Sequence, residues 1–253
     1  MRTFELAGVE VPRVGLGTNR LTTAADHVSF VREAVAEGLR HIDTAHLYSG
    51  GDSERAIGEA LAGGRGDVVV ATKGGYRPGE GRPEVLTAQI EQSLRSLRTD
   101  AIRLYYLHRV DPETPLEESL GAIRAHVDRG DIRHVGISDV GVDEIERARR
   151  IVPIAAVQNR YNLADRRHDD VIDYCEREGI AFVPYFPLRG RGGSGVAKAA
   201  ARIDVSENAV ALAWLLHRSP VVLPIPGTLS IEHLRENLGA LELDLGDAPN
   251  IAA

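Results

Sequence analysis

The chain has 253 residues, of which 43% are hydrophobic and 26% are charged, and its formal net charge is −7. A chain of this length can bury a large apolar core without disulfides, and its single cysteine, Cys175, cannot form an internal bridge. The acidic balance without a basic run argues against a nucleic-acid surface, and no segment approaches the ~20 apolar residues of a membrane span. Because the first residues are too polar for a secretory signal, we expect a cytoplasmic protein that binds neither nucleic acid nor membrane.

Strand-like apolar runs alternate with amphipathic, helix-like segments along the chain, after an initial FELAGVEV that predicts a short hairpin with Ala-Gly at its turn. Leu86, Ile90 and Leu94 recur at helical spacing, and VVVA is apolar on both faces, which is typical of a buried parallel strand. The predicted strands lie near residues 13–17, 40–43, 67–73, 103–108, 133–138, 154–158, 180–185 and 221–224. The predicted helices lie near residues 24–37, 53–62, 83–97, 115–129, 141–151, 167–178, 206–217 and 230–240.

Eight β/α units without a linker or a low-complexity stretch favour one closed barrel. A doubly wound sheet usually has fewer strands and a recognisable phosphate-binding fingerprint in its first turn. We therefore predict an α/β fold, a (β/α)8 TIM barrel, formed by a single domain over residues 1–253. The hairpin at its start is expected to close the bottom of the barrel.

Lysine is rare in this chain, because the 30 basic residues are 28 arginines and two lysines, Lys73 and Lys198. Lysine is a compact charge whose pKa shifts readily on burial, whereas arginine stays charged. Lys73 follows a strongly apolar run in VVVATKGG, while Lys198, in the Ala-rich GVAKAAARI, fits an ordinary solvated helix position. Lys73 is therefore the lysine that we expect to have a function.

Four ionisable side chains are predicted to meet at the C-terminal ends of three consecutive strands. Asp43, Lys73 and His108 end the second, third and fourth strands, and Tyr48 follows Asp43 in the next loop. A barrel carries its active site at this end. The alternative is a structural role, in which a buried Asp–Lys ion pair has a histidine and a tyrosine nearby. We favour a functional site, because all four residue types avoid a core strand unless they are paired or used.

These residues are suited to donating a proton to a carbonyl oxygen. Tyr48, with an ordinary pKa of ~10, is a poor acid at neutral pH, and a buried ammonium at Lys73 is expected to lower that pKa. Asp43 would keep Lys73 charged, and His108 could hydrogen bond to the carbonyl oxygen or relay the proton. Since no side chain supplies a hydride, the chemistry implies a nicotinamide cofactor.

Several motifs stand in the order in which a known family has them. They are DTAxxYxxGxSExxIGxAL, ATKxG, LHxxDP, GIS, VQNRYNL and PIPGTxxxxHLxEN, within a match that runs from Gly15 to Asn237. The chain thereby resembles the aldo-keto reductase superfamily, and more loosely a bacterial branch that includes pyridoxal reductases. The resemblance implies a barrel that reduces an aldehyde or ketone with NAD(P)H and without metal or flavin. It places the family's catalytic residues at Asp43, Tyr48, Lys73 and His108.

The resemblance also implies which positions bind the cofactor. Ser138 and Gln158 match ligands of the nicotinamide carboxamide, and Tyr185 matches the ring that stacks on the nicotinamide. Asp139 stands where the family usually has Asn, and a carboxylate can accept a hydrogen bond but cannot donate one. The remaining expected contacts are Thr18, Asn19 and Asp43, then Phe186, Leu188 and Gly190 around the pyrophosphate, and Gly227, Thr228, His233, Glu236 and Asn237 at the adenosine phosphate.

The choice between NADPH and NADH depends on the adenosine end. Gly227 and His233 replace the Lys and Arg that many family members place on the 2′-phosphate, which leaves NADH possible. His233 and the nearby Arg235 could still bind that phosphate, so NADPH is the expected cofactor. The glycine-rich run 190–195 fits either a nest of backbone N–H groups for the phosphates or a flexible connector.

The substrate end of the site is expected to be open and weakly selective towards small carbonyl compounds. The segment after Leu188 is short, and the chain ends at Ala253, where longer family members use a C-terminal tail to wall the pocket. No metal site is expected, because the remaining histidines lack metal-ligand spacing. The oligomeric state stays open. The candidate lining residues are Asn19, His46, Leu47, Tyr76 and Arg109.

Two other functions stay open on the sequence alone. A barrel with this site could bind the dinucleotide as a cofactor-sensing regulatory module with little turnover. It could also be a lyase that forms a Schiff base at Lys73, although Asp43 and Tyr48 favour a charged lysine over the neutral amine that a nucleophile needs.

Overall fold

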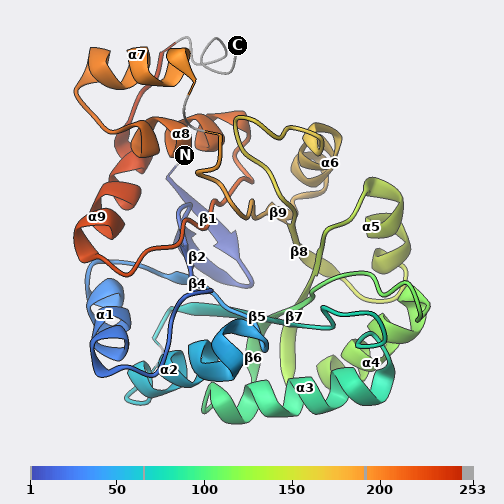
Figure 1. Cartoon of the computed structure of the whole chain (residues 1–253). Helices are drawn as coiled ribbons and strands as arrows, with labels where there is room; N and C mark the ends of the chain where they lie inside the picture. Colours follow the sequence, from blue (N-terminus) through green and yellow to red (C-terminus); the bar gives the residue numbers. More distant parts are fainter. Residues whose placement is uncertain (1, 65, 191–192, 247–253) are drawn as a thin grey trace.

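The computed structural model describes residues 2–64, 66–190 and 193–246, which form a curled parallel sheet surrounded by helices (Figure 1). The strands of this sheet follow one another in chain order, and each pairs with the next. In β5, for example, every residue is buried, because one face points into the curled sheet and the other packs against helices. The strand bounds are β3 (Leu16–Gly17), β4 (His41–Asp43), β5 (Val69–Gly74), β6 (Ile102–Leu107), β7 (Ile132–Ser138), β8 (Ile154–Gln158) and β9 (Ala181–Phe182).

Helices follow the strands and pack an apolar side against the outer face of the sheet. The helix α4 shows the pattern, since Leu116, Leu120 and Ile123 are buried at helical spacing. The helix α7 is an addition to the predicted set, and Lys198 is exposed on it, as expected. Within the described ranges, no helix has both the length and the apolarity to cross a lipid bilayer. The helix bounds are α1 (Ala25–Ala36), η1 (Tyr48–Gly51), α2 (Asp52–Ala60), α3 (Pro83–Ser96), α4 (Leu116–Arg129), α5 (Val142–Arg149), α6 (Asp169–Glu178), α7 (Ser194–Ile203), α8 (Glu207–Arg218), α9 (Ile231–Gly239) and η2 (Ala240–Glu242).

The predicted N-terminal hairpin is confirmed, with β1 (Thr3–Leu6) antiparallel to β2 (Val9–Pro12). Ala7 and Gly8 at its turn both have positive φ, 50° and 74°, which the tight turns of hairpins require. Arg103, near the start of β6, donates a hydrogen bond to the carbonyl of Ala7 at 3.4 Å. The hairpin therefore packs at the N-terminal ends of the strands. The hairpin and the inner face of the sheet form one apolar cluster, which includes Leu6, Val11, Val69, Leu104 and Ala156.

The segment predicted as the eighth strand, residues 221–224, is not a strand of the sheet. It makes isolated bridges, with β9 at Val222 and, further along, with β3 at Gly227. Pro224 and Pro226 have no backbone N–H group to donate to a continuous ladder of hydrogen bonds. Their carbonyl oxygens accept hydrogen bonds from the backbone N–H groups of Gly15 and Gly17, at 2.9 and 3.2 Å. The chain here thus lies between the first and last strands of the sheet with irregular pairing.

Candidate active site

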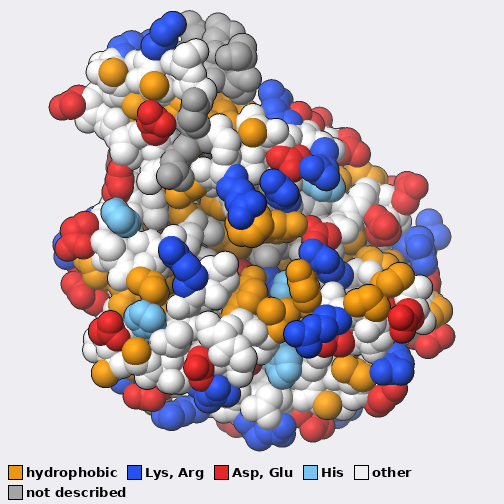
Figure 2. Space-filling model, viewed as in Figure 1, with side chains coloured by type: hydrophobic (Ala, Val, Ile, Leu, Met, Phe, Trp, Pro, Cys, Tyr) orange, Lys and Arg blue, Asp and Glu red, His pale blue; other side chains and the backbone are white. Residues whose placement is uncertain are grey.

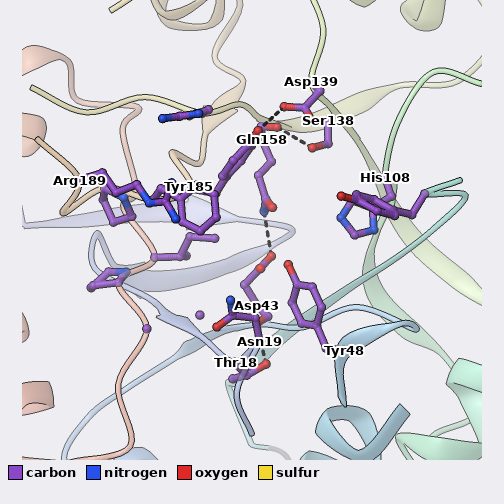
Figure 3. Close-up of a pocket in the computed structure, with 18 of the residues that line it drawn as sticks. Thr18, Asn19, Asp43, Tyr48, His108, Ser138, Asp139, Gln158, Tyr185 and Arg189 are labelled. Carbon is purple, nitrogen blue, oxygen red and sulfur yellow. Dashed lines mark hydrogen bonds between the residues drawn. The ribbon is translucent and has the colours of Figure 1, made fainter. Parts of the chain in front are cut away.

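A pocket of about 560 Å³ opens where the C-terminal ends of the strands meet. On the face shown in Figure 2, hydrophobic side chains gather at the centre, with Lys and Arg side chains around them. Asp43, Tyr48 and His108 line this pocket (Figure 3). The structure therefore brings these predicted residues together at the end of the sheet opposite the hairpin.

Lys73 and Asp43 form a buried ion pair beneath the pocket. Lys73 Nζ lies 2.7 Å from Asp43 Oδ1 and donates a second hydrogen bond to the carbonyl of Thr44 at 2.6 Å. The two side chains are 0% and 2% exposed. Burial by itself would lower the pKa of Lys73, but its interactions with Asp43 and Tyr48 together outweigh burial and raise that pKa above the ordinary value. Lys73 is therefore an ammonium, and not the neutral amine that a Schiff base requires.

Asp43 is held from its other side by Gln158. Gln158 Nε2 donates to Asp43 Oδ2 at 2.8 Å, and Ser138 Oγ donates to the backbone oxygen of Gln158 at 2.7 Å (Figure 3). Both carboxylate oxygens of Asp43 are thus satisfied, as a buried charge requires. The contact joins the ends of two strands far apart in the chain, and no local pattern in the sequence indicates it.

Tyr48 begins the short helix η1, directly after the loop that follows β4. Gly50 and Gly51 have φ values of 64° and 90°, so the chain turns sharply here in a conformation that favours glycine. Lys73 Nζ lies 4.9 Å from the centre of the Tyr48 ring. Figure 3 shows Tyr48 beside Asp43, with His108 next to it and Tyr185 across the cavity.

The pKa of Tyr48 differs from the sequence-based prediction. Burial raises the pKa of this phenol, and although the ammonium of Lys73 lowers it, the result is above the ordinary value of 10. The expected lowering is therefore wrong for the protein alone, because desolvation outweighs the nearby positive charge. Tyr48 consequently holds its proton throughout the neutral pH range.

His108 faces the pocket from the end of β6 and is only 8% exposed. Its ring centre lies 6.2 Å from that of Tyr48 and 4.8 Å from that of Tyr76. Burial, followed by the positive charges of Lys73 and Arg109, lowers the pKa of His108 to about 2. The imidazole is therefore neutral, and its Nδ1 has no hydrogen-bond partner among the described residues. A neutral ring with a free nitrogen can hydrogen bond to a ligand in the pocket.

Asp139 connects two sides of the pocket rim. It follows β7 with a φ of 57°, a left-handed conformation that aspartate adopts more readily than most residues. Tyr185 Oη donates to Asp139 Oδ1 at 2.8 Å, and Arg109 Nε lies 3.3 Å from Asp139 Oδ2 (Figure 3). Asp139 thus acts as an acceptor, as its chemistry demands, and it orients a tyrosine and an arginine at the pocket.

Most residues predicted to bind the cofactor line this pocket, and their chemistry fits a nicotinamide dinucleotide. The half-buried ring of Tyr185 offers a flat surface, and Gln158 and Ser138 offer polar groups beside it. Arg189, stacked 4.1 Å from the centre of the Phe186 ring, offers a cation for phosphate. The predicted residues in the lining are Thr18, Asn19, Asp43, Ser138, Asp139, Gln158, Tyr185, Phe186, Leu188 and Gly227.

Of the residues predicted for the adenosine end, Gly227 lines the pocket, whereas the others lie outside its lining, just before α9 and within it. Ser230 caps this helix by accepting a hydrogen bond from the backbone N–H of His233 at 3.2 Å. Gly190 has a φ of 77° and packs against Ala164. Arg191 and Gly192, in the glycine-rich run, lie outside the described residues. The predicted adenosine contacts beyond Gly227 are Thr228, His233, Glu236 and Asn237.

Leu47, Tyr76 and Arg109 line the main pocket, as predicted. His46 lines an adjoining cavity of about 350 Å³, which shares Leu47 and Tyr76 with the main pocket and also contains Lys73 in its lining. Arg235, which could bind the 2′-phosphate, pairs with Glu37 through two nitrogens, at 2.7 and 3.1 Å.

Arg160 also lines the main pocket, although no motif chemistry marked it. Its position gives one signal, because it comes two residues after Gln158 and successive side chains of a strand alternate between faces. A residue two positions beyond a lining residue therefore tends to point the same way. Arg160 Nε lies 3.2 Å from Asp165 Oδ2, in a carboxylate that Arg167 also binds through two nitrogens, at 2.7 and 2.9 Å.

Comparison with known proteins agrees with this geometry. The family model for the aldo/keto reductase family matches residues 13–194 and 193–250. Pyridoxine 4-dehydrogenase of Escherichia coli (strain K12) is 36% identical over 270 residues, which cover 97% of this chain and 94% of that protein. A thermostable aldo-keto reductase in complex with the inhibitor epalrestat has a TM-score of 0.89 at 34% identity, over 98% of this chain and 96% of that one. An aldo/keto reductase from Klebsiella pneumoniae in complex with NADP and acetate has a TM-score of 0.85 at 30% identity, over 96% and 90%.

Proposed function

This chain belongs to the aldo/keto reductase family, and on that premise we propose that it reduces an aldehyde or ketone to the alcohol with NADPH. The observation that carries the proposal is the convergence of Tyr48, His108 and the Lys73–Asp43 pair at one pocket. The matched solved structure that contains NADP supports the choice of cofactor. We further propose that segment 221–227 completes the curled sheet as the eighth position of a closed barrel and that the whole chain acts as one domain.

Tyr48 is the proposed proton donor. When bound, the reduced nicotinamide supplies the hydride that the carbonyl carbon accepts. As charge develops on the carbonyl oxygen, the O–H bond of Tyr48 breaks, the oxygen takes the proton and the phenolate remains on Tyr48. Because the pKa of Tyr48 is raised, the phenol is fully protonated and ready at neutral pH.

Lys73 and His108 provide the electrostatic support for this step. The ammonium of Lys73, fixed by Asp43, stabilises the phenolate that forms on Tyr48. The neutral imidazole of His108 donates a hydrogen bond from a ring N–H to the carbonyl oxygen and so positions it. Gln158 donates a hydrogen bond to the second oxygen of Asp43. The carboxylate of Asp43 therefore does not compete for the proton of Tyr48.

The cofactor would lie across the strand ends, from Tyr185 towards α9. In this proposal Tyr185 stacks on the nicotinamide, Ser138 and Gln158 bind its carboxamide, and Arg189 meets the pyrophosphate. At the far end, His233 is exposed at the start of α9 and is the proposed contact for a 2′-phosphate.

The test is the loss of absorbance at the reduced-nicotinamide band, with NADPH and NADH compared over small aldehydes, ketones and pyridoxal. Pyridoxal is included because one relative is a pyridoxine 4-dehydrogenase. We expect turnover, with NADPH the better donor. If NADPH binds tightly by fluorescence titration but no carbonyl is reduced, the reductase proposal fails, and a cofactor-sensing module takes its place.

A further inference from the structure

Arg109 presents an uncommitted part of its guanidinium to the active-site pocket. Its Nε lies 3.3 Å from Asp139 Oδ2, while its terminal nitrogens form no hydrogen bond with the residues that the structure describes. The side chain is 47% exposed, so solvent or a ligand can reach it. Guanidinium nitrogens left open in a pocket form a planar fork that suits the two oxygens of a carboxylate.

The position of this fork is fixed by packing. Arg109 Cζ lies 4.4 Å from the centre of the Tyr76 ring, and that ring lies 4.8 Å from the ring of His108. The backbone N–H of Arg109 donates to the carbonyl of Gly75 at 3.1 Å, which ties the strand end to the loop that carries Tyr76. A cation stacked on an aromatic ring is held without losing its hydrogen-bonding edge.

The loop beneath Tyr76 is itself anchored. Asp111 accepts hydrogen bonds from the backbone N–H groups of Gly79 and Gly81, at 3.0 and 2.8 Å, and from Thr114 Oγ1 at 3.0 Å. Arg109 and its platform are therefore organised before any substrate enters, which lowers the entropic cost of binding an anion there.

The neighbouring charges leave Arg109 available. Asp139 already accepts from Tyr185 on one oxygen and faces Arg109 Nε with the other, so the pairing uses one edge of the guanidinium. Arg160, which lines the same pocket, faces Asp165 at 3.2 Å, a carboxylate that also binds Arg167 at 2.7 and 2.9 Å. His108 is neutral and adds no charge beside the fork.

We propose that Arg109 selects carbonyl substrates that carry a carboxylate, by binding that group while the carbonyl oxygen meets Tyr48 and His108. This inference rests on the proposed reductase function and names its substrate class. Because the Tyr76 ring lies 4.4 Å from Arg109 Cζ and 4.8 Å from the His108 ring centre, a short spacer between carbonyl and carboxylate is enough.

The test compares substrates that differ in charge but hardly in shape. The probes are 3- and 4-formylbenzoate against the corresponding 3- and 4-formylbenzamides, with benzaldehyde as a common reference, and kcat and KM are measured for each. We expect kcat/KM to favour at least one benzoate over its amide by about tenfold, mainly through a lower KM. A tenfold preference is at the low end of what a charged hydrogen-bonding pair contributes, because the site is half exposed.

The variants assign that preference to a residue. Arg109→Gln is expected to bring the benzoate-to-benzamide ratio to about one, and Arg109→Lys to keep part of it, because lysine retains the charge but not the fork. The matched control is Arg77→Gln. Arg77 follows Tyr76 in the sequence and its side chain is 75% exposed, so this variant removes an equal charge from the surface. This variant should keep the wild-type ratio. A loss of folded protein would change both substrates equally and cancel in the ratio.

The outcomes separate two failures. If the wild-type enzyme reduces benzaldehyde but shows no preference for either benzoate, or if Arg109→Gln leaves a preference intact, the role of Arg109 is overturned while the reductase function stands. If none of the aldehydes, charged or neutral, is reduced with either cofactor, the proposed function itself fails.

Discussion

The hydroxyl of Tyr48 is subject to two opposing effects, and their balance matters for its proposed role. Burial raises the pKa of the phenol, while the ammonium of Lys73, 4.9 Å from the ring centre, lowers it. A donor with a high pKa holds its proton at neutral pH but releases it reluctantly. Release therefore depends on charge developing on the carbonyl oxygen and on Lys73 stabilising the phenolate, an interaction that grows only as the proton leaves.

Tyr48→Phe tests this role with minimal change of shape. We expect kcat to fall by a factor of about 10² to 10⁴, the range typical of losing a general acid, because the variant loses the hydroxyl next to Lys73. The affinity for NADPH, measured by fluorescence titration, should change little, since the predicted cofactor contacts are other residues. Turnover at the wild-type rate would contradict the assignment.

Among the elements, α2 and α3 approach each other closely enough that one glycine decides whether they pack. A Cβ atom added at Gly58, in α2, would lie 2.3 Å from the carbonyl oxygen of Ser96 at the end of α3. That distance is far below contact, and the obstacle is backbone, which cannot rotate away. The glycine in the IGxAL segment is thus required by packing between helices.

Gly58→Ala is expected to destabilise the protein by about 1–3 kcal/mol, because overpacking outweighs the better helix propensity of alanine. Gly121→Ala, in α4, is the control, since that glycine is exposed and an added Cβ would meet nothing within 4 Å. This control should be stabilised by up to ~1 kcal/mol. Urea unfolding followed by circular dichroism measures both, and equal shifts of the same sign in the two variants would refute the packing argument.

The sequence predicts these elements well wherever a local pattern reports the burial of one face. Regular apolar spacing locates α3 and α4, and the strand ends carry Asp43 and His108 to one rim. The failures are non-local. Pro224 interrupts a strand-like apolar run, so residues 221–224 bridge without forming a strand. His46 shares a loop with Tyr48, yet it lines a different cavity, because the side chains of a sharp turn point in different directions.

For the molecule as a whole, a histidine buried inside the curled sheet makes stability depend on pH. His41, in β4, is fully buried, and neither ring nitrogen has a hydrogen-bond partner among the described residues. Burial lowers the pKa of His41 from 6.5 to about 4; the charge of Asp43 partly offsets this lowering, and the charge of Lys73 adds to it. Between these two values the unfolded chain binds a proton that the folded protein does not, so stability falls as the pH falls through this window.

The expected loss from His41 between pH 7 and pH 4 is about 3 kcal/mol. Replacing it by leucine, His41→Leu, should remove this part of the acid sensitivity and leave stability at pH 7 equal or higher. Urea unfolding at pH 7.0, 5.5 and 4.5 provides the comparison with the wild type. An unchanged difference between pH 7.0 and 4.5 in the variant would show that other groups cause the acid sensitivity.

The contrast between the two lysines has a practical consequence for bioconjugation. The ε-amine of Lys73 is sealed beneath the pocket, whereas Lys198 is exposed on α7, a helix that Figure 1 shows at the edge of the molecule. Of the two lysine side chains, an acylating reagent therefore meets only Lys198. A dye attached to that lysine would sit on a peripheral helix, so labelling this side chain leaves the ion pair beneath the pocket untouched.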